Sequence, residues 1–218
     1  IFGQHFATSK LLDVECDLET ILFEAKKYYA NIVLPYTKQA RKIAETVQQL
    51  DIELIATSHG VSWTNHIPDI LALYQEMTTS KKENKAVVVY DTMWGNTKEM
   101  AVAITEAFRS ANITVRLYNV NDTEHADLIT EIMDATYLAV GSSTLNNNLL
   151  PPIAAFLTYL KGMAPVGLQT IAFGSYGWGG QSIAQVATAL EEMGYAPLLP
   201  PIKSLYNPKP EQLEQIRD

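Results

Sequence analysis

Hydrophobic and polar positions follow two different patterns along this chain, and the change falls near residue 80. Before it, apolar residues recur at the three-and-four spacing of a helix face, first over 18–25. Asp17 stands at the N-cap position of this helix, and Pro35 is expected to break or kink it. Pro68 suits the first turn of a later helix that runs to about residue 77. The pattern predicts a mostly helical first part with one short strand over 52–56.

After a polar stretch over 78–85, short apolar runs alternate with amphipathic helical patterns. Short apolar strands separated by helices are typical of a parallel sheet covered on both faces. We therefore expect an α/β fold with a doubly wound parallel sheet in the flavodoxin-like order 2-1-3-4-5. The domains are expected to span 1–80 and 84–218. The strands are predicted over 86–90, 113–118, 135–141 and 168–173, with a weaker one over 196–199.

Composition narrows the class of protein. Apolar residues make up 47% and charged residues 18% of the 218 residues, as in ordinary globular proteins. No apolar run approaches the roughly 20 residues of a membrane helix, so we expect no membrane span. The formal net charge of −8 argues against nucleic-acid binding.

A single cysteine, Cys16, excludes an internal disulfide, a Cys-ligated zinc site and an iron–sulfur cluster. We place the protein in the cytoplasm, because nothing in the sequence reads as a secretory signal. Because the chain starts at Ile1 inside what reads as ordered sequence, we expect it to be a piece of something longer.

The loop after the first predicted strand of the sheet leads directly into a helix. In an open parallel sheet, ligands bind at the carboxyl ends of the strands where the strand order reverses, and this loop lies there. A helix N-terminus is an anion site. The loop has no Lys or Arg and lacks the GxxxxGK[ST] pattern, which suits one terminal phosphate rather than a triphosphate. An ordinary strand–helix turn fits this loop equally well. Its candidate binding residues are Thr92, Met93, Trp94, Gly95, Asn96 and Thr97.

Two further loops are expected at the same edge. Tyr176 and Trp178, with Trp94, offer stacking surfaces for an aromatic ring, and the glycines around them allow close backbone approach. The middle loop offers amides and hydroxyls for the polar edge of such a ring. One phosphate, a flat ring and a hydrogen-bonding edge together point to FMN. The candidates are Ser142, Ser143, Thr144, Leu145, Asn146, Asn147 and Asn148 in the middle loop, and Ser175, Tyr176, Gly177, Trp178 and Gly179 in the third.

These loops resemble a specific family, the flavodiiron proteins (A-type flavoproteins, including rubredoxin:oxygen oxidoreductase). The resemblance lies in Thr92-Met93-Trp94, in the segment 143–147 and in the segment 175–178. The segments 2–5, 27–32 and 58–61 resemble the C-terminal part of that family's metallo-β-lactamase-like domain.

The resemblance implies a non-haem di-iron centre that reduces O2 to water, NO to N2O, or both, with electrons arriving through FMN. His59 matches the family's last iron ligand, whereas His5, His66 and His125 match none. The family's other ligands lie upstream of Ile1, so this chain alone is expected to bind FMN and not to turn over O2 or NO. It would be a proteolytic fragment, or a companion N-terminal fragment would carry the remaining ligands.

The resemblance further implies a head-to-tail homodimer or tetramer, and an electron donor such as rubredoxin or a reductase. Two other functions stay open at this point. One is a flavodoxin-like electron-transfer module without di-iron catalysis. The other, less favoured because nothing supplies a nicotinamide site, is a quinone or disulfide reductase.

Overall fold

The computed structural model describes residues 1–218, and the chain divides into two units, Ile1–Lys81 and Lys82–Asp218. In the second unit a parallel sheet has the strand order β2-β1-β3-β6-β7, with β8 also pairing with β6. This order confirms the predicted doubly wound α/β fold. The strands are β1 (Glu83–Tyr90), β2 (Thr114–Asn119), β3 (Ala135–Gly141), β6 (Gln169–Tyr176), β7 (Ala196–Pro197) and β8 (Ile202–Leu205).

Strand β1 begins three residues before its predicted apolar run, inside the polar stretch over 78–85 that precedes the predicted sheet. Lys85 is buried, and its ammonium group forms ion pairs with Asp134 and Glu131. The Thr136 hydroxyl donates a hydrogen bond of 2.6 Å to the Glu83 carbonyl. These polar contacts extend the sheet into residues that hydropathy alone assigns to a loop.

The fifth position of the sheet is filled by two short strands rather than by the single strand predicted over 196–199. Strand β7 pairs with the first residues of β6, and β8 pairs with its last four. Strand β7 ends at Pro197, and Pro200 and Pro201 lie between it and β8; proline cannot donate to a strand ladder. The carboxyl end of this position therefore lies at Leu205, six residues later than the sequence indicates.

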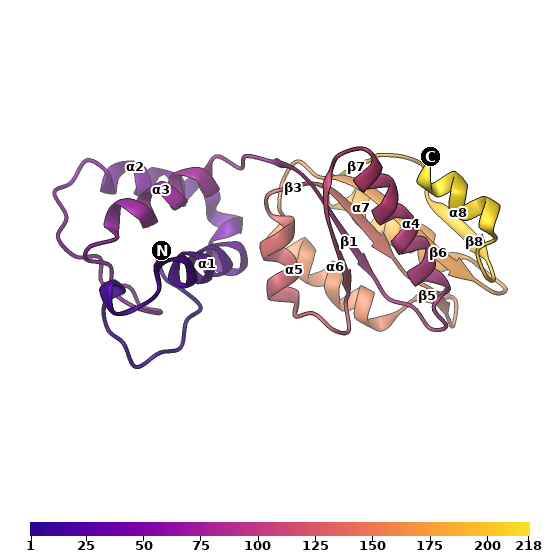
Figure 1. Ribbon diagram of the computed structural model, residues 1–218, viewed down its shortest axis with the longest axis horizontal. Coiled ribbons are helices and arrows are strands. Elements are labelled where there is room, and N and C mark those ends of the chain that lie inside the picture. The colour runs from indigo at the N-terminus through magenta and orange to yellow at the C-terminus, as the bar shows by residue number, and fades with distance from the viewer. The chain divides into compact units, whose positions relative to one another are not determined.

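Helices cover both faces of the sheet (Figure 1). On one face Ala86 and Val88 of β1 form a core with Met100 and Ile104 of α4, and α8 packs beside α4. The alternate residues of β1 are also buried, so the opposite face is covered as well. No helix is both long and apolar enough to cross a membrane. The helices are α4 (Asn96–Ser110), α5 (His125–Ile132), α6 (Pro151–Met163), α7 (Gln181–Glu192) and α8 (Pro210–Arg217).

The first unit is helical, as predicted. The Asp17 carboxylate caps α1 by accepting a hydrogen bond of 2.9 Å from the Thr20 amide. Around Pro35 the helix changes register through a π-helical turn and a 3-10 turn, so the proline kinks the path rather than ending it. Its elements are η1 (Asp13–Glu15), α1 (Leu18–Tyr28), η2 (Tyr29–Val33), η3 (Leu34–Tyr36), α2 (Thr37–Val47) and α3 (Ile67–Thr78).

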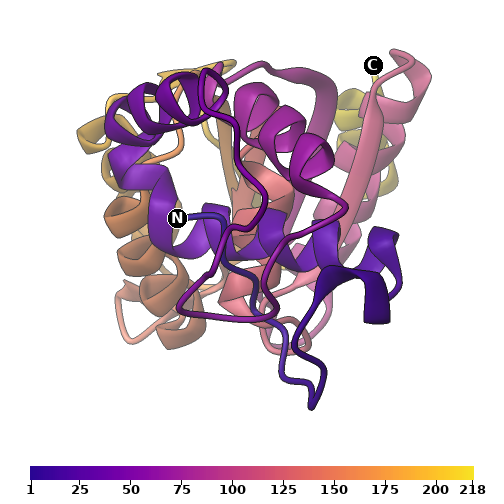
Figure 2. The ribbon, with the colours of Figure 1, turned by 90° about the vertical axis from the view of Figure 1, so that its left-hand side faces the viewer.

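The N-terminal segment runs among these helices (Figure 2). The Phe2 amide donates to the Tyr74 hydroxyl at 2.8 Å, and the Trp63 indole donates to the Phe2 carbonyl at 2.8 Å. The strand predicted over 52–56 was wrong, because only Ile55 forms a single bridge, to Trp63.

One buried carboxylate organises the loops of this unit. Asp13 is fully buried and accepts hydrogen bonds from the amides of Val14, Thr64 and His66 and from the Thr64 hydroxyl. Burial raises the pKa of this carboxyl, but the hydrogen bonds from Thr64, His66 and Val14 outweigh it, so the pKa lies below its ordinary value.

We expect Asp13→Asn to lower the free energy of unfolding by about 2 kcal/mol at pH 7, because the amide nitrogen would face N–H donors. A lowered folded-state pKa stabilises above the unfolded value of about 3.9 and loses that contribution as pH falls through the folded value, so the variant should also show a smaller loss on acidification. Urea unfolding at pH 7 and pH 3 measures both when it is followed by tryptophan fluorescence in a Trp94→Phe, Trp178→Phe background, where only the buried Trp63 reports. Asp17→Asn is the matched control, because asparagine caps a helix as well as aspartate does. Equal effects of the two substitutions would contradict this role for Asp13.

Candidate functional site

The loop between β1 and α4 is shaped by hydrogen bonds within itself. The buried Asp91 carboxylate accepts from the Thr92 amide at 2.7 Å and from the Asn121 side-chain amide at 2.8 Å. The Thr92 hydroxyl accepts from the Gly95 amide at 3.1 Å. Gly95 has φ of 90°, a left-handed conformation that favours glycine, and α4 starts at the next residue. The first amides of α4 therefore lie at the end of the loop, and they have no hydrogen-bond acceptor inside the helix.

Three buried hydroxyls connect this loop to the two others. The Thr97 hydroxyl lies 2.9 Å from the Ser143 hydroxyl and 3.0 Å from the Ser175 hydroxyl. All three side chains are buried. Thr97 lies in the first turn of α4, which follows β1; Ser143 lies just after β3; and Ser175 lies near the end of β6. We call Thr97, Ser143 and Ser175 the hydroxyl triad. It fixes the distances between the three loops at their bases.

The middle loop is a small hairpin of β4 (Thr144–Leu145) and β5 (Asn148–Leu149). Its two turn residues, Asn146 and Asn147, have φ of 49° and 62°, which asparagine tolerates better than most residues. Helix α7 holds the hairpin from outside. Gln185 accepts from the Leu149 amide at 2.9 Å and donates to the Asn148 side chain at 3.1 Å. The hairpin is thus braced without any ligand.

The third loop begins at Gly174, where two backbones approach closely. A Cβ at this position would lie 2.0 Å from the Ser142 carbonyl oxygen, so no larger residue fits. Ser142 is itself buried, and its hydroxyl accepts from the Leu150 amide at 2.9 Å. This contact brings the third loop against the start of the middle loop.

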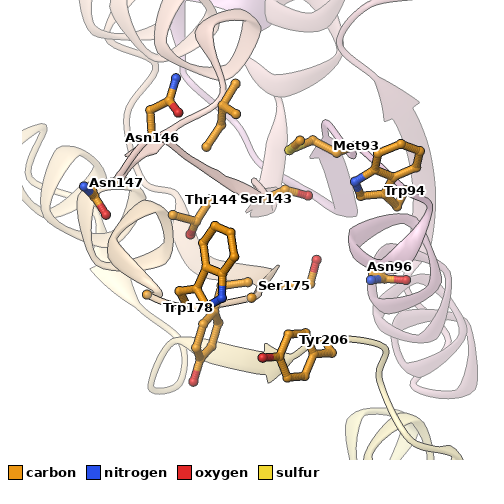
Figure 3. Close-up of a pocket in the computed structure, with 14 residues that line it drawn as sticks. Met93, Trp94, Asn96, Ser143, Thr144, Asn146, Asn147, Ser175, Trp178 and Tyr206 are labelled. Carbon is orange, nitrogen blue, oxygen red and sulfur yellow. The ribbon is translucent and has the colours of Figure 1, made fainter.

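Between the loops lies a cavity of about 550 Å³ (Figure 3). Trp178 is fully exposed and Trp94 is 85% exposed, so both indoles border the cavity without being packed into the core. No side chain with a formal charge lines it. The lining residues are Met93, Trp94, Asn96, Ser143, Thr144, Leu145, Asn146, Asn147, Ser175, Tyr176, Gly177, Trp178, Gly179 and Tyr206.

Five of the candidate residues do not line the cavity. Thr97 and Ser142 lie buried beneath its surface, Thr92 and Gly95 shape the first loop, and Asn148 contacts Gln185. The structure brings the remaining candidates together around one space.

Tyr206 lines the cavity but was missed by sequence reasoning. It directly follows β8, at the carboxyl end of the fifth strand position. The signal in the sequence is the short segment over 202–205 that follows Pro200 and Pro201, whereas the predicted strand ends at residue 199.

His59 lies in a separate loop in the first unit. Its carbonyl accepts from the Gln4 amide at 3.1 Å, and the Gln4 side chain in turn accepts from the Val61 amide at 2.6 Å. The Tyr28 ring lies 5.8 Å from the imidazole of His59 and 5.3 Å from that of His5. Burial lowers the pKa of His5, although Glu24 opposes the shift.

The chain offers no group of three or more His, Cys, Asp or Glu side chains placed to hold a metal ion. A di-iron centre needs several His and carboxylate ligands.

Comparison with known proteins adds to this geometry. Residues 88–218 match the sequence profile of the flavodoxin family. The chain belongs to the flavodoxin family. This match does not reach the first unit, Ile1–Lys81, so similarity over that unit has to come from longer proteins.

Larger relatives match both units. The chain is 39% identical to a nitric oxide reductase of Moorella thermoacetica over 82% of this chain and 45% of the relative. The structure of rubredoxin oxygen:oxidoreductase from Desulfovibrio gigas superposes with a TM-score of 0.94 at 36% identity, covering 100% of this chain and 55% of that one. The flavodiiron protein from Giardia intestinalis gives a TM-score of 0.92 at 31% identity, with 99% and 54% covered.

The chain thus spans about half the length of these relatives. The similarity to these relatives extends beyond the flavodoxin unit into Ile1–Lys81.

In this flavodoxin unit, we expect Thr97→Val to lower the free energy of unfolding by about 1–3 kcal/mol, because buried serine hydroxyls lose their shared partner. Thr105→Val is the matched control. Thr105 is buried in the same helix, but its hydroxyl bonds only to the Ala101 carbonyl one turn earlier. That carbonyl keeps its helical partner, so the control should change stability by less than about 0.5 kcal/mol. Urea unfolding followed by circular dichroism distinguishes the two, and equal losses would show that the triad adds nothing.

Proposed function

We propose that this chain binds FMN in the cavity of the flavodoxin unit and is the flavin-carrying part of an oxidoreductase. The observation that carries the proposal is the cavity itself, which has no charged lining side chain, is bordered by two exposed indoles and is lined by Asn96, the first residue of α4. Membership of the flavodoxin family supports the same cofactor.

The phosphate would lie at the N-terminus of α4. Gly95 turns the chain so that the helix begins at Asn96, and the free amides there favour an anion. The Asn96 side chain lines the cavity and can donate to a phosphate oxygen. No lysine or arginine lines the cavity, so one phosphate suits this end better than a chain of phosphates would.

The flat ring would lie between the indoles of Trp94 and Trp178. An exposed tryptophan costs hydration free energy that a stacked ligand recovers. The hairpin of β4 and β5 offers backbone and asparagine groups to the polar edge of the ring. When bound, FMN supplies one- or two-electron transfer, while the chain orients it and excludes water from its faces.

The substrate of the longer protein is proposed to be O2, NO or both, reduced to water or N2O. The relatives named nitric oxide reductase and rubredoxin oxygen:oxidoreductase support this class of reaction. We infer that Ile1–Lys81 is the C-terminal part of a metallo-β-lactamase-like domain. His59 would be one ligand of its di-iron centre, and a companion N-terminal segment would supply the others.

The remaining partners follow the same proposal. A rubredoxin or a reductase would donate electrons, and a head-to-tail homodimer or tetramer would bring one copy's flavin to the other copy's metal. The second candidate function is a flavodoxin-like electron-transfer module without di-iron catalysis. The lack of a sufficient ligand set in this chain favours that alternative for the chain taken alone.

The purified chain is expected to bind one FMN, more tightly than riboflavin by at least about tenfold, because riboflavin lacks the phosphate. The dissociation constant should change little with salt, because no charged side chain lines the cavity. Trp178→Ala should weaken binding about three- to tenfold through lost stacking. Titration followed by quenching of flavin fluorescence measures all three values. Riboflavin binding as tightly as FMN, or preferred binding of a nucleoside triphosphate, would contradict the proposal.

Measurement of the iron content tests the proposed role of His59 as a ligand of a di-iron centre. The chain alone, after anaerobic incubation with Fe²⁺ and gel filtration, should retain no stoichiometric iron while keeping FMN. The same sequence joined to the upstream half of a flavodiiron relative should hold two irons, and His59→Ala should lower that content. His59→Ala should leave FMN affinity unchanged, which controls for misfolding. Full iron content in the joined His59→Ala variant would remove His59 from the ligand set.

A further inference from the structure

Tyr206 is the one cavity residue that comes from outside the three loops, and its backbone is unusual. Its φ of 58° lies in the left-handed region, which is uncommon for an aromatic residue. Asn207 follows it and would tolerate that conformation more readily. Backbone conformations of this kind cluster at ligand-binding and catalytic sites.

The left-handed turn brings the Tyr206 ring to the third loop. Tyr176 pairs with Leu205 across β6 and β8, and the Tyr206 amide then donates to the Tyr176 carbonyl at 2.7 Å. A Cβ built on Gly177 would lie 3.6 Å from the Tyr206 ring and would meet no other residue within 4 Å. The Tyr206 ring therefore lies beside Gly177 of the third loop.

The segment that carries Tyr206 is braced on its other side. Gln212 of α8 donates to the Lys203 carbonyl at 2.7 Å and accepts from the Ser204 hydroxyl at 3.0 Å. Arg217 at the end of α8 forms an ion pair with Glu106 of α4 at 2.5 Å. Tyr206 therefore follows a strand end, β8, that hydrogen bonds to Gln212 of α8 hold in place.

In the close-up Tyr206 is drawn between Trp178 and Asn96, on the side away from Asn146 (Figure 3). Trp178 is one of the two indoles proposed to flank the flat ring, and Asn96 is the first residue of the helix proposed to hold the phosphate. The Tyr206 side chain remains 58% exposed, so its ring is available to a ligand.

We propose that Tyr206 is a fourth wall of the cofactor site and contacts the sugar-alcohol chain that joins the flavin ring to its phosphate. The proposal rests on the proposed FMN function. A phenol suits this place, because its ring packs against the carbon chain and its hydroxyl donates to or accepts from the chain's hydroxyls.

The test compares three ligands that differ only in this region. FMN carries the sugar-alcohol chain and the phosphate, riboflavin carries the chain alone, and lumiflavin carries neither. Tyr206→Gly should weaken FMN and riboflavin by the same factor, about three- to tenfold, and should leave lumiflavin unchanged. Tyr206→Phe should lose about threefold for FMN and riboflavin, because only the hydroxyl is removed. The visible circular dichroism of bound FMN should change in Tyr206→Gly and recover in Tyr206→Phe.

Two controls separate ligand contact from backbone effects. Ala164→Gly removes a similar left-handed strain, at φ of 47°, from the end of α6 and should alter no ligand affinity. If Tyr206→Gly disturbs folding, Tyr206→Asn keeps a residue that tolerates the turn and should show the same selective loss.

Each outcome decides the proposal. Unchanged affinities in Tyr206→Gly, or an equal loss for lumiflavin, would overturn it while leaving FMN binding intact. Failure of the unmodified chain to bind FMN would overturn the proposed function first and this inference with it.

Discussion

The hydroxyl of Thr97 is the constraint on which the candidate site depends. It lies within hydrogen-bond distance of Ser143 and Ser175, residues 46 and 78 positions away along the chain. The sheet alone brings the ends of β1, β3 and β6 to one edge, but loops beyond strand ends are free to separate. A buried, neutral hydrogen-bond network fixes them at a cost in desolvation that its mutual bonds offset. No member of this network titrates near neutral pH.

The candidate site is lined by neutral residues although the chain as a whole is acidic. The chain carries a formal net charge of −8, yet no charged side chain lines the cavity. Asp91, the acidic residue at the start of the first loop, is buried and holds the Thr92 amide and the Asn121 side chain instead of facing the opening. An anionic ligand can therefore be held by helix amides and neutral donors without a competing carboxylate in the cavity. The net charge of the whole chain was a poor guide to its binding site.

The fold was largely predictable because its signal is the alternation of apolar strands and amphipathic helices, which requires no long-range information. The sheet order and the convergence of three loops follow from that alternation and from the rule for parallel sheets. Tyr206 was not predictable in the same way, because prolines split the fifth strand position and moved its carboxyl end to Leu205. The start of β1 was missed because a buried ion pair of Lys85 supports it, and hydropathy treats lysine as exposed. The prediction of a strand over 52–56 was wrong because only Ile55 in this segment pairs with another residue, in a single bridge to Trp63.

The two candidate centres differ in what this chain supplies. All the segments that line the cavity belong to one sheet and its connections, so one cooperative unit positions every wall. The His59 loop is also well held, since the Gln4 side chain occupies the space where a Cβ of Gly60 would lie, and the Gly60 backbone has φ of 79°. These contacts hold the backbone around His59, whose imidazole is exposed beside the Tyr28 ring. Under the proposed function, the remaining metal ligands would therefore be brought to a loop whose backbone is already held in place.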